Sequence, residues 1–425
     1  MPNIISKFFK NLDRRFKVML IAVGLYNWIR GLTSQYDQLY AVALGANPVE
    51  LGSLTGIGGA ANSMISAPAG WLIDKYGVKR LIIFGLILSA VVSGIYGCAV
   101  DWWVLIPAII FAQICMRMIV PLTDIIFVGT TKLEERALAM GFSRTIWAIP
   151  SAFAPMIAAM IVDRFGGINV QGIRPLYYVQ LVSIMFVILF IVFVLEPQQT
   201  RLVANSSKSV SRTSLIEDFR ELFKGESWLK HWAIIMGLHA FSMNISSPFV
   251  PLWMVSEKGA GPYLLGIVGT VGTVTSALLQ IPMGGLADKI GRKKTFLLLC
   301  PFSYLGTILL ILAPISEFLI AVGILGVAGA MLMGGIGSVS FISFITMFWE
   351  TVPADKRGRW FGFAGIFNIF AVPASILGGF MWQTGLMELV LISPVIIEVL
   401  IMIPLLSMIP DTLSQSNHEQ KHPEE

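Results

Sequence analysis

Long apolar segments recur along the whole chain, and they leave few folds open to it. About 20 apolar residues, at roughly 1.5 Å per residue, cross the ~30 Å hydrocarbon core of a bilayer. Of the 425 residues, 56% are hydrophobic and only 13% are charged, more apolar surface than a soluble domain hides. We therefore predict an all-α integral membrane protein with twelve spans: 18–42, 51–73, 81–100, 103–128, 137–162, 176–195, 231–255, 263–287, 295–313, 318–348, 361–381 and 386–409.

Lys and Arg fall almost entirely on one side of these spans. Apart from Arg30 and Arg117, which lie within spans, only Arg164, Arg174 and Lys258 fall on the other side. Positively charged loops stay in the cytoplasm. The bias predicts that both termini are cytoplasmic and that the protein lies in the inner or plasma membrane. Loops beside anionic lipid also account for the net charge of +5, which leaves no basic surface for nucleic acid.

Two short segments repeat each other at an offset of 214 residues. Residues 67–80 read APAGWLIDKYGVKR and residues 281–294 read IPMGGLADKIGRKK, with seven of the fourteen positions identical. Each segment follows the second span of its half, and six spans per half make the two repeats parallel. We predict a tandem duplication with a binding site between the halves. The expected domains are an N-terminal segment 1–17, a bundle 18–196, a flexible linker with a surface helix 197–230, a bundle 231–409 and a tail 410–425.

The repeated segment resembles the signature loop of the Major Facilitator Superfamily, G-x-L-x-D-[RK]-x-G-[RK]-[RK], and the resemblance covers essentially the whole chain. It implies twelve helices in two pseudo-symmetric bundles, transport by alternating access, and no cofactor. It also implies that the loop aspartate latches the cytoplasmic side; the alternative is that the loop only sets topology and a tight turn. The positions concerned are Gly70, Asp74, Gly77, Lys79, Arg80, Gly284, Asp288, Gly291 and Arg292, with Glu350 and Arg357 as expected partners.

Two pairs of ionisable residues lie inside spans, where a charge costs at least about 2.5–3.5 kcal/mol and must face a cavity or a partner. Arg30 and Asp37 lie in the first span, and Arg117 and Asp124 lie in the fourth. A spacing of seven residues is two helical turns, so we expect each pair to share one helix face. In the family, the first and fourth helices line the central cavity, which agrees with these two charged faces.

Arginine and aspartate predict different roles in such a cavity. A guanidinium offers a planar set of donors for a carboxylate or phosphate, whereas Asp37 or Asp124 can carry a proton when it faces a low-dielectric cavity. The pattern is similar to proton-coupled organic-anion transporters of the superfamily. We therefore predict proton-coupled symport or antiport of a small anionic or polar solute. The predicted solute-binding residues are Tyr26, Asn27, Arg30, Gln113, Arg117, His239, Ser242, Asn244, Gln280 and Asn368.

Other interpretations remain open on the sequence. The four charges could form a purely structural network. A proton-driven multidrug exporter is another candidate. The chain has Pro150 at the proline of the exporter signature G-x-x-x-G-P-x-x-G-G, but it lacks the glycines of that signature. A membrane sensor or scaffold without transport would need a signalling domain. An enzyme would need a metal cluster, or a nucleophile with its base, and no span carries either.

Three smaller expectations concern the cysteines, Glu398 and the oligomeric state. The three cysteines, Cys98, Cys115 and Cys300, lie in apolar spans without CxxC spacing and are expected to pack rather than to bind metal. Glu398 has no evident partner in the last span, and we expect it at the lipid edge. The protein is expected to act as a monomer whose partners are a small solute, protons and the bilayer.

Overall fold

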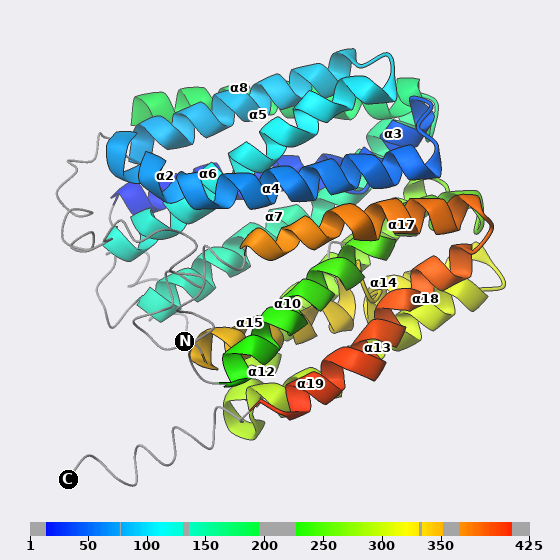
Figure 1. The fold of residues 1–425 in the computed structure, drawn as a ribbon. Coiled ribbons are helices and arrows are strands. Elements are labelled where there is room, and N and C mark those ends of the chain that lie inside the picture. Colours follow the sequence, from blue (N-terminus) through cyan, green and yellow to red (C-terminus); the bar gives the residue numbers. More distant parts are fainter. Residues whose placement is uncertain are drawn as a thin grey trace, which may run out of the picture.

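A computed structural model of the chain describes residues 14–76, 78–130, 136–194, 227–330, 334–351 and 365–409. Within these ranges the protein is helical and contains no strand, and Figure 1 shows the helices in two bundles, α2–α8 and α10–α19. Several predicted positions fall outside this description. Gly77, Arg357, both terminal segments and most of the 197–230 linker are not described, and neither are the side chains of Asp74, Arg117 and Asp124.

The described helices follow the twelve predicted spans, although several spans are divided between two helices. By length and apolar composition alone, seven described helices could cross a bilayer, and two shorter ones are also apolar. The first half contains α2 (Arg14–Thr33), α3 (Asp37–Ala43), α4 (Pro48–Tyr76), α5 (Val78–Cys98), η1 (Trp102–Val104), α6 (Leu105–Thr130), α7 (Arg136–Arg164) and α8 (Val170–Val194). The second half contains α10 (Ser227–Ser246), α11 (Val250–Ser256), α12 (Pro262–Ile290), α13 (Arg292–Leu312), η4 (Ser316–Phe318), α14 (Leu319–Leu325), α15 (Gly335–Thr351), η6 (Phe367–Phe370), α17 (Ala371–Gln383), α18 (Met387–Ile397), the π-helix η7 (Glu398–Met402) and α19 (Ile403–Ser407).

The helix bounds repeat the offset found in the sequence. Helices α4, α5 and α6 begin 214 residues before α12, α13 and α14, respectively. The repeated lysines also make equivalent contacts. Lys79 Nζ donates to the carbonyl of Val192 (3.3 Å), and Lys293 Nζ donates to the carbonyl of Ser407 (3.0 Å). In both halves a cation thus stabilises the C-terminal end of the last helix, where carbonyl groups lack helical partners.

The first span of each half is divided by a short turn, at 34–36 and at 247–249. The last residue of each turn is aromatic, Tyr36 in the first half and Phe249 in the second, and its side chain has no exposed surface. Its backbone N–H donates to the carbonyl of the last residue of the preceding helix, Thr33 or Ser246. The prediction of one continuous helix over 18–42 is therefore wrong. Arg30 and Asp37 do not lie two turns apart on one helix, because the buried aromatic side chain anchors a turn between them.

The tenth span is interrupted more deeply. Helix α14 ends at Leu325 and α15 begins at Gly335, and Gly326, Gly329, Gly334 and Gly335 have φ of +86°, +78°, +76° and +82°. Glycine adopts these angles without the steric cost that a side chain would add. The prediction of one helix over 318–348 is wrong here. Backbone outside a helix is tolerated at membrane depth only where protein buries it or where it lines a cavity.

The two halves meet along α4 with α17 and along α7 with α12. Figure 1 shows α4 and α17 lying beside each other across the boundary between the bundles. Gly52 and Gly266, which are equivalent in the repeat, allow this approach: a Cβ at Gly52 would collide with the carbonyl oxygen of Ser375, and one at Gly266 with Ala159. Small residues bring membrane helices close together. These contacts lie toward the helix ends that are predicted to face outside.

Candidate solute-binding site

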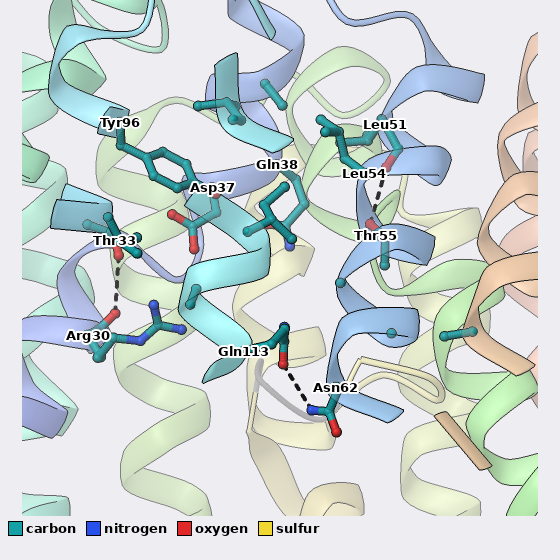
Figure 2. A pocket seen from close by; sticks show the side chains of 18 of the residues that line it. Arg30, Thr33, Asp37, Gln38, Leu51, Leu54, Thr55, Asn62, Tyr96 and Gln113 are labelled. Atoms are coloured by element: carbon teal, nitrogen blue, oxygen red, sulfur yellow. Dashed lines mark hydrogen bonds between the residues drawn. The ribbon is translucent and has the colours of Figure 1, made fainter. Parts of the chain in front are cut away.

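A cavity of about 340 Å³ lies between the two halves. Most of its wall comes from α2, α3, α4, α5, α6 and α8 of the first half, and Figure 2 shows side chains from several of these helices converging on it. The second half contributes Asn244, Asn368 and Ala371. The volume is within the range of about 300–1,000 Å³ that small-molecule sites occupy.

Arg30 and Asp37 both line this cavity. Arg30 belongs to the last turn of α2 and Asp37 to the first turn of α3, so the two residues that reach the wall flank the turn at 34–36. Figure 2 shows both side chains directed toward the same space. Their charges attract each other, but among the described residues neither forms an ion pair within 4.0 Å. Both charged groups therefore remain available to a third species in the cavity.

A cluster of tyrosines holds Asp37. The hydroxyl of Tyr177 donates to Asp37 Oδ1 at 3.0 Å, and its ring stacks on Tyr96 with centroids 4.7 Å apart. Tyr40 lies against Tyr177, donates to the carbonyl of Tyr96 (2.9 Å) and accepts from Arg174 Nε (3.2 Å). Buried aromatic groups with satisfied hydroxyls form rigid supports. The cluster fixes the carboxylate in position without neutralising it.

Amide side chains supply the neutral polar part of the wall. Asn62 Nδ2 donates to Gln113 Oε1 at 2.9 Å, as Figure 2 shows. Gln38 also lines the cavity, and its buried Oε1 has no hydrogen-bond partner in the described part of the chain. On the opposite side, Asn244 and Asn368 each donate to a backbone carbonyl of their own segment. The wall thus presents amide oxygens and nitrogens that suit a polar solute.

Some predicted residues lie elsewhere. Tyr26 is 4% exposed within a hydrophobic cluster of the first half, and Asn27 and Gln280 do not line the cavity. His239 and Ser242 line a second, smaller cavity inside the second half, where Glu398 also lies. Glu398 is therefore not at the lipid edge, contrary to our expectation, because the last span turns it toward α10 and α13.

Several wall residues were missed by the sequence analysis, in particular Tyr177 and Gln180 of α8 and Asn62 of α4. A signal was present, because Tyr177 and Gln180 are three residues apart in an otherwise apolar span and share one helix face. Neutral polar groups in the second and sixth spans carry no formal charge, so they indicate a cavity less strongly than Arg30 or Asp37.

Part of the predicted gate is assembled in the second bundle, where α12 ends and α13 begins. Arg292 Nη1 lies 2.6 Å from Asp288 Oδ1, and Arg292 Nε lies 3.2 Å from Glu350 Oε1. Gly291, with φ of +103°, forms the tight turn between α12 and α13 that allows this geometry. Gly70 and Gly284 lie within α4 and α12, and Arg80 is exposed on α5. Whether the ionic cluster works as a gate remains a prediction.

A family model described as the Major Facilitator Superfamily matches the chain twice, over residues 19–236 and 232–424. The chain belongs to the Major Facilitator Superfamily. It is a multi-pass membrane transporter rather than an enzyme, and the two matches agree with the duplication in the sequence and in the helix bounds.

Solved structures share the fold. The chain is similar to a crystal structure of a mutant of the nucleoside transporter NupG, with a TM-score of 0.75 at 13% identity over 94% of this chain and 100% of that one. It is also similar to a D-xylose–proton symporter, with a TM-score of 0.63 at 13% identity over 92% of this chain and 98% of the other. At this level of identity the likeness concerns the fold alone.

One characterised relative matches in sequence. Multidrug resistance protein 2 of Bacillus subtilis (strain 168) is 22% identical over 238 residues, which are 55% of this chain and 57% of the relative. The match thus spans little more than half the length of that protein.

Proposed function

We propose that this chain is a proton-coupled secondary transporter of a small polar or anionic organic solute, which binds in the cavity at Arg30 and Asp37. The observation that carries the proposal is the presence of a guanidinium and a carboxylate on one cavity wall between the halves, with no ion pair between them. A charged side chain at membrane depth costs free energy, and residues kept there despite this cost usually mark the pathway of a solute or an ion.

The transport cycle follows from competition for Asp37. Arg30, a proton and the solute all act on the same carboxylate or its immediate surroundings, so a change in one alters the free energy of the others. Arg30 holds an anionic or strongly polar group of the solute, while Asp37 exchanges its proton as the halves rock about the site. Asp124, whose side chain is not described, is the second proposed carrier, and Arg117 the second proposed solute ligand.

The class of solute receives support from two sides. The wall combines two charges with the amides of Asn62, Gln113, Asn244 and Asn368, which suits a solute rich in hydrogen-bonding groups. The names of two structures with the same fold refer to nucleosides and D-xylose, which are small polar molecules. A solute of comparable size fits a cavity of about 340 Å³.

Orientation and assembly complete the proposal. The positively charged loops support a cytoplasmic location of both termini, with the protein in the inner or plasma membrane. The described contacts between the halves then close the outer end of the cavity, at Gly52 with Ser375 and at Gly266 with Ala159. We propose that a monomer carries out transport, because the two halves of one chain both contribute to the wall of the cavity.

The test is transport by the purified protein in proteoliposomes, with and without an imposed pH gradient. We expect the gradient to drive uptake of a weak organic acid, and Asp37→Asn to lose that dependence. Asp163→Asn is the matched control, because Asp163 is exposed at the end of α7. Unchanged pH dependence in both Asp37→Asn and Asp124→Asn would refute proton coupling, and absence of transport of any solute would favour a sensor or scaffold.

A proton-driven exporter is the second candidate, and the name of the Bacillus subtilis relative favours it. An exporter of amphipathic cations needs an acid in the cavity but no guanidinium, so it should expel a cationic dye and should retain activity in Arg30→Ala. A transporter of polar or anionic solutes should instead show no efflux of the dye, and its Arg30→Ala variant should lose solute transport. Running both assays on one preparation separates the two functions.

A further inference from the structure

A second cavity lies inside the second half, separate from the solute-binding site. Its volume is about 40 Å³, and its wall combines α10, α13, the non-helical segment after α14, α15 and the π-helix η7. A single water molecule needs about 10–15 Å³ of such space, so the cavity holds about three species of that size. It is too small for an organic solute and large enough for an ion with one or two waters.

Oxygen atoms dominate the polar part of this wall. Ser303, Ser338 and Ser340 all line it, and each donates its hydroxyl proton to a helix carbonyl three residues earlier, at 2.7, 2.8 and 2.6 Å. A hydroxyl whose proton is already donated presents only lone pairs to other groups. These three groups can therefore accept from a donor or coordinate a cation, although Ser338 Oγ also lies 2.8 Å from Ser276 Oγ and has less capacity to spare.

Glu398 supplies the negative charge. It begins the π-helix η7, a type of helical defect that is frequent at functional sites. No ion pair to Glu398 is formed within the described residues. The titratable groups that face it are Tyr304 and Cys300 from α13 and His239 from α10. His239 stacks on Phe341 with centroids 5.2 Å apart in a largely apolar setting. A carboxyl group so placed is either protonated or balanced by a counter-charge.

The interrupted tenth span contributes backbone groups to the same wall. Val327, Ala328 and Gly329 line the cavity without being helical. The carbonyl of Val327 accepts from the N–H of Ala330 (3.2 Å), whereas those of Ala328 and Gly329 accept no backbone hydrogen bond from the described residues. Beside them, the hydroxyl of Ser246 is fully buried, lies against Gly329 and has no hydrogen-bond partner in the described part of the protein. In secondary transporters, unwound carbonyls at membrane depth coordinate coupling cations.

We propose that this cavity binds one sodium ion, coordinated by the Glu398 carboxylate together with serine hydroxyl and backbone carbonyl oxygens. One carboxylate balances one monovalent charge, and the hydroxyl and carbonyl oxygens that share the wall with it suit a hard cation, although His239, Met243 and Met402 also line the cavity. No cluster of three His, Cys, Asp or Glu side chains exists among the described residues, which argues against a transition-metal site. The inference concerns binding in the second half alone, so it is independent of proton coupling at Asp37.

The test is binding of radioactive sodium to the purified full-length protein in lipid nanodiscs, with choline replacing sodium in the competition series. Saturable binding with one ion per chain is expected. Glu398→Gln should weaken it by about tenfold or more, because the only formal negative charge of the site is lost. Glu388→Gln is the matched control, since Glu388 lies on the same span but is exposed, and it should bind sodium like the unaltered protein.

A second variant keeps the test decisive if Glu398→Gln does not fold. Ser242→Ala removes one buried hydroxyl from the wall while leaving the carboxylate in place, and it should weaken sodium binding by about threefold to tenfold. Three results would overturn the proposal: no saturable sodium binding, equal binding by the folded Glu398→Gln variant, or a Glu398-dependent response of thermal stability to pH with none to sodium. The last result would make Glu398 a proton site instead.

Discussion

The fourth span of the first half and the tenth span of the second half occupy equivalent places in the repeat, yet they have different backbones. Helix α6 is continuous from Leu105 to Thr130, whereas the equivalent segment is helical only to Leu325 and again from Gly335. At an offset of 214, Gly326 and Gly335 stand where the first half has Ala112 and Pro121. Glycine permits the positive φ that interrupts the helix, while Pro121 does not prevent α6 from remaining helical.

The two halves have also placed their ionisable groups differently. The first half has Arg30 and Asp37 in its first span, facing the cavity between the halves. Aligned on its internal turn, the second half has Val250 in place of Asp37, and its acid inside a span is Glu398, whose cavity lies within the bundle. A duplicated fold can thus keep the residues at which its helices begin, while the backbone inside a span and the chemistry of each half diverge.

The largest effect should come from removing the charge in the first half. Arg30→Ala should lower the transport rate by about 100-fold, because a charge-assisted contact to the solute is worth up to about 3 kcal/mol. Uptake into proteoliposomes measures it. Arg164→Ala, which alters an exposed arginine at the end of α7, should transport normally. Similar rates in both variants would show that the first half is not where the solute is held.

One added methyl group in the interrupted tenth span should lower the stability of the protein. Gly326→Ala should destabilise the protein by about 1–3 kcal/mol, since φ is +86° there and a Cβ would lie 2.8 Å from the carbonyl oxygen of Gly334. Thermal unfolding in detergent measures this. Gly94→Ala is the control within a regular helix, where a Cβ meets no atom within 4 Å and helix propensity predicts a gain of about 0.5–1 kcal/mol. Equal stability of the two variants would contradict the assigned backbone.

The support of Asp37 should matter less than the charges themselves. Tyr177→Phe removes the 3.0 Å hydrogen bond to Asp37 and should lower transport by about tenfold, a cost of about 1–1.5 kcal/mol, with a changed pH profile. Tyr178→Phe removes a bond of similar length, 2.8 Å to the carbonyl of Gly97, away from the cavity. Rates recorded across a pH series should change for Tyr177→Phe alone, and an altered profile in Tyr178→Phe would remove the specific role of Tyr177.

The smallest effect concerns the ionic cluster at the end of α12. Arg292→Val copies Val78, the equivalent residue of the first half, and breaks the contacts with Asp288 and Glu350. Because these side chains are partly exposed, the loss of stability should be only about 0–1 kcal/mol. Denaturation midpoints provide the measurement. A change in transport much larger than the change in stability would indicate that the cluster controls a conformational step.

The sequence by itself determined the architecture. Segments long and apolar enough to cross a bilayer can satisfy their backbone groups only as helices, and the repeated loop together with the 214-residue offset fixed the division into equivalent halves. It also identified Arg30, Asp37, Gln113, Asn244 and Asn368, all of which line the central cavity. Burying such polar groups in a membrane span is expensive, so their presence alone predicts a cavity.

Only the tertiary structure decided how the spans are interrupted and which neutral groups complete each site. The turn at Tyr36 depends on the burial of an aromatic ring by other helices, and the contact of Tyr177 with Asp37 joins residues 140 positions apart. Glu398 seemed isolated along the chain because the serines and the unwound backbone around it come from other spans. The periodicity of a sequence shows which residues share one face of one helix. A site is formed by several packed helices, and local sequence does not show which helices pack together.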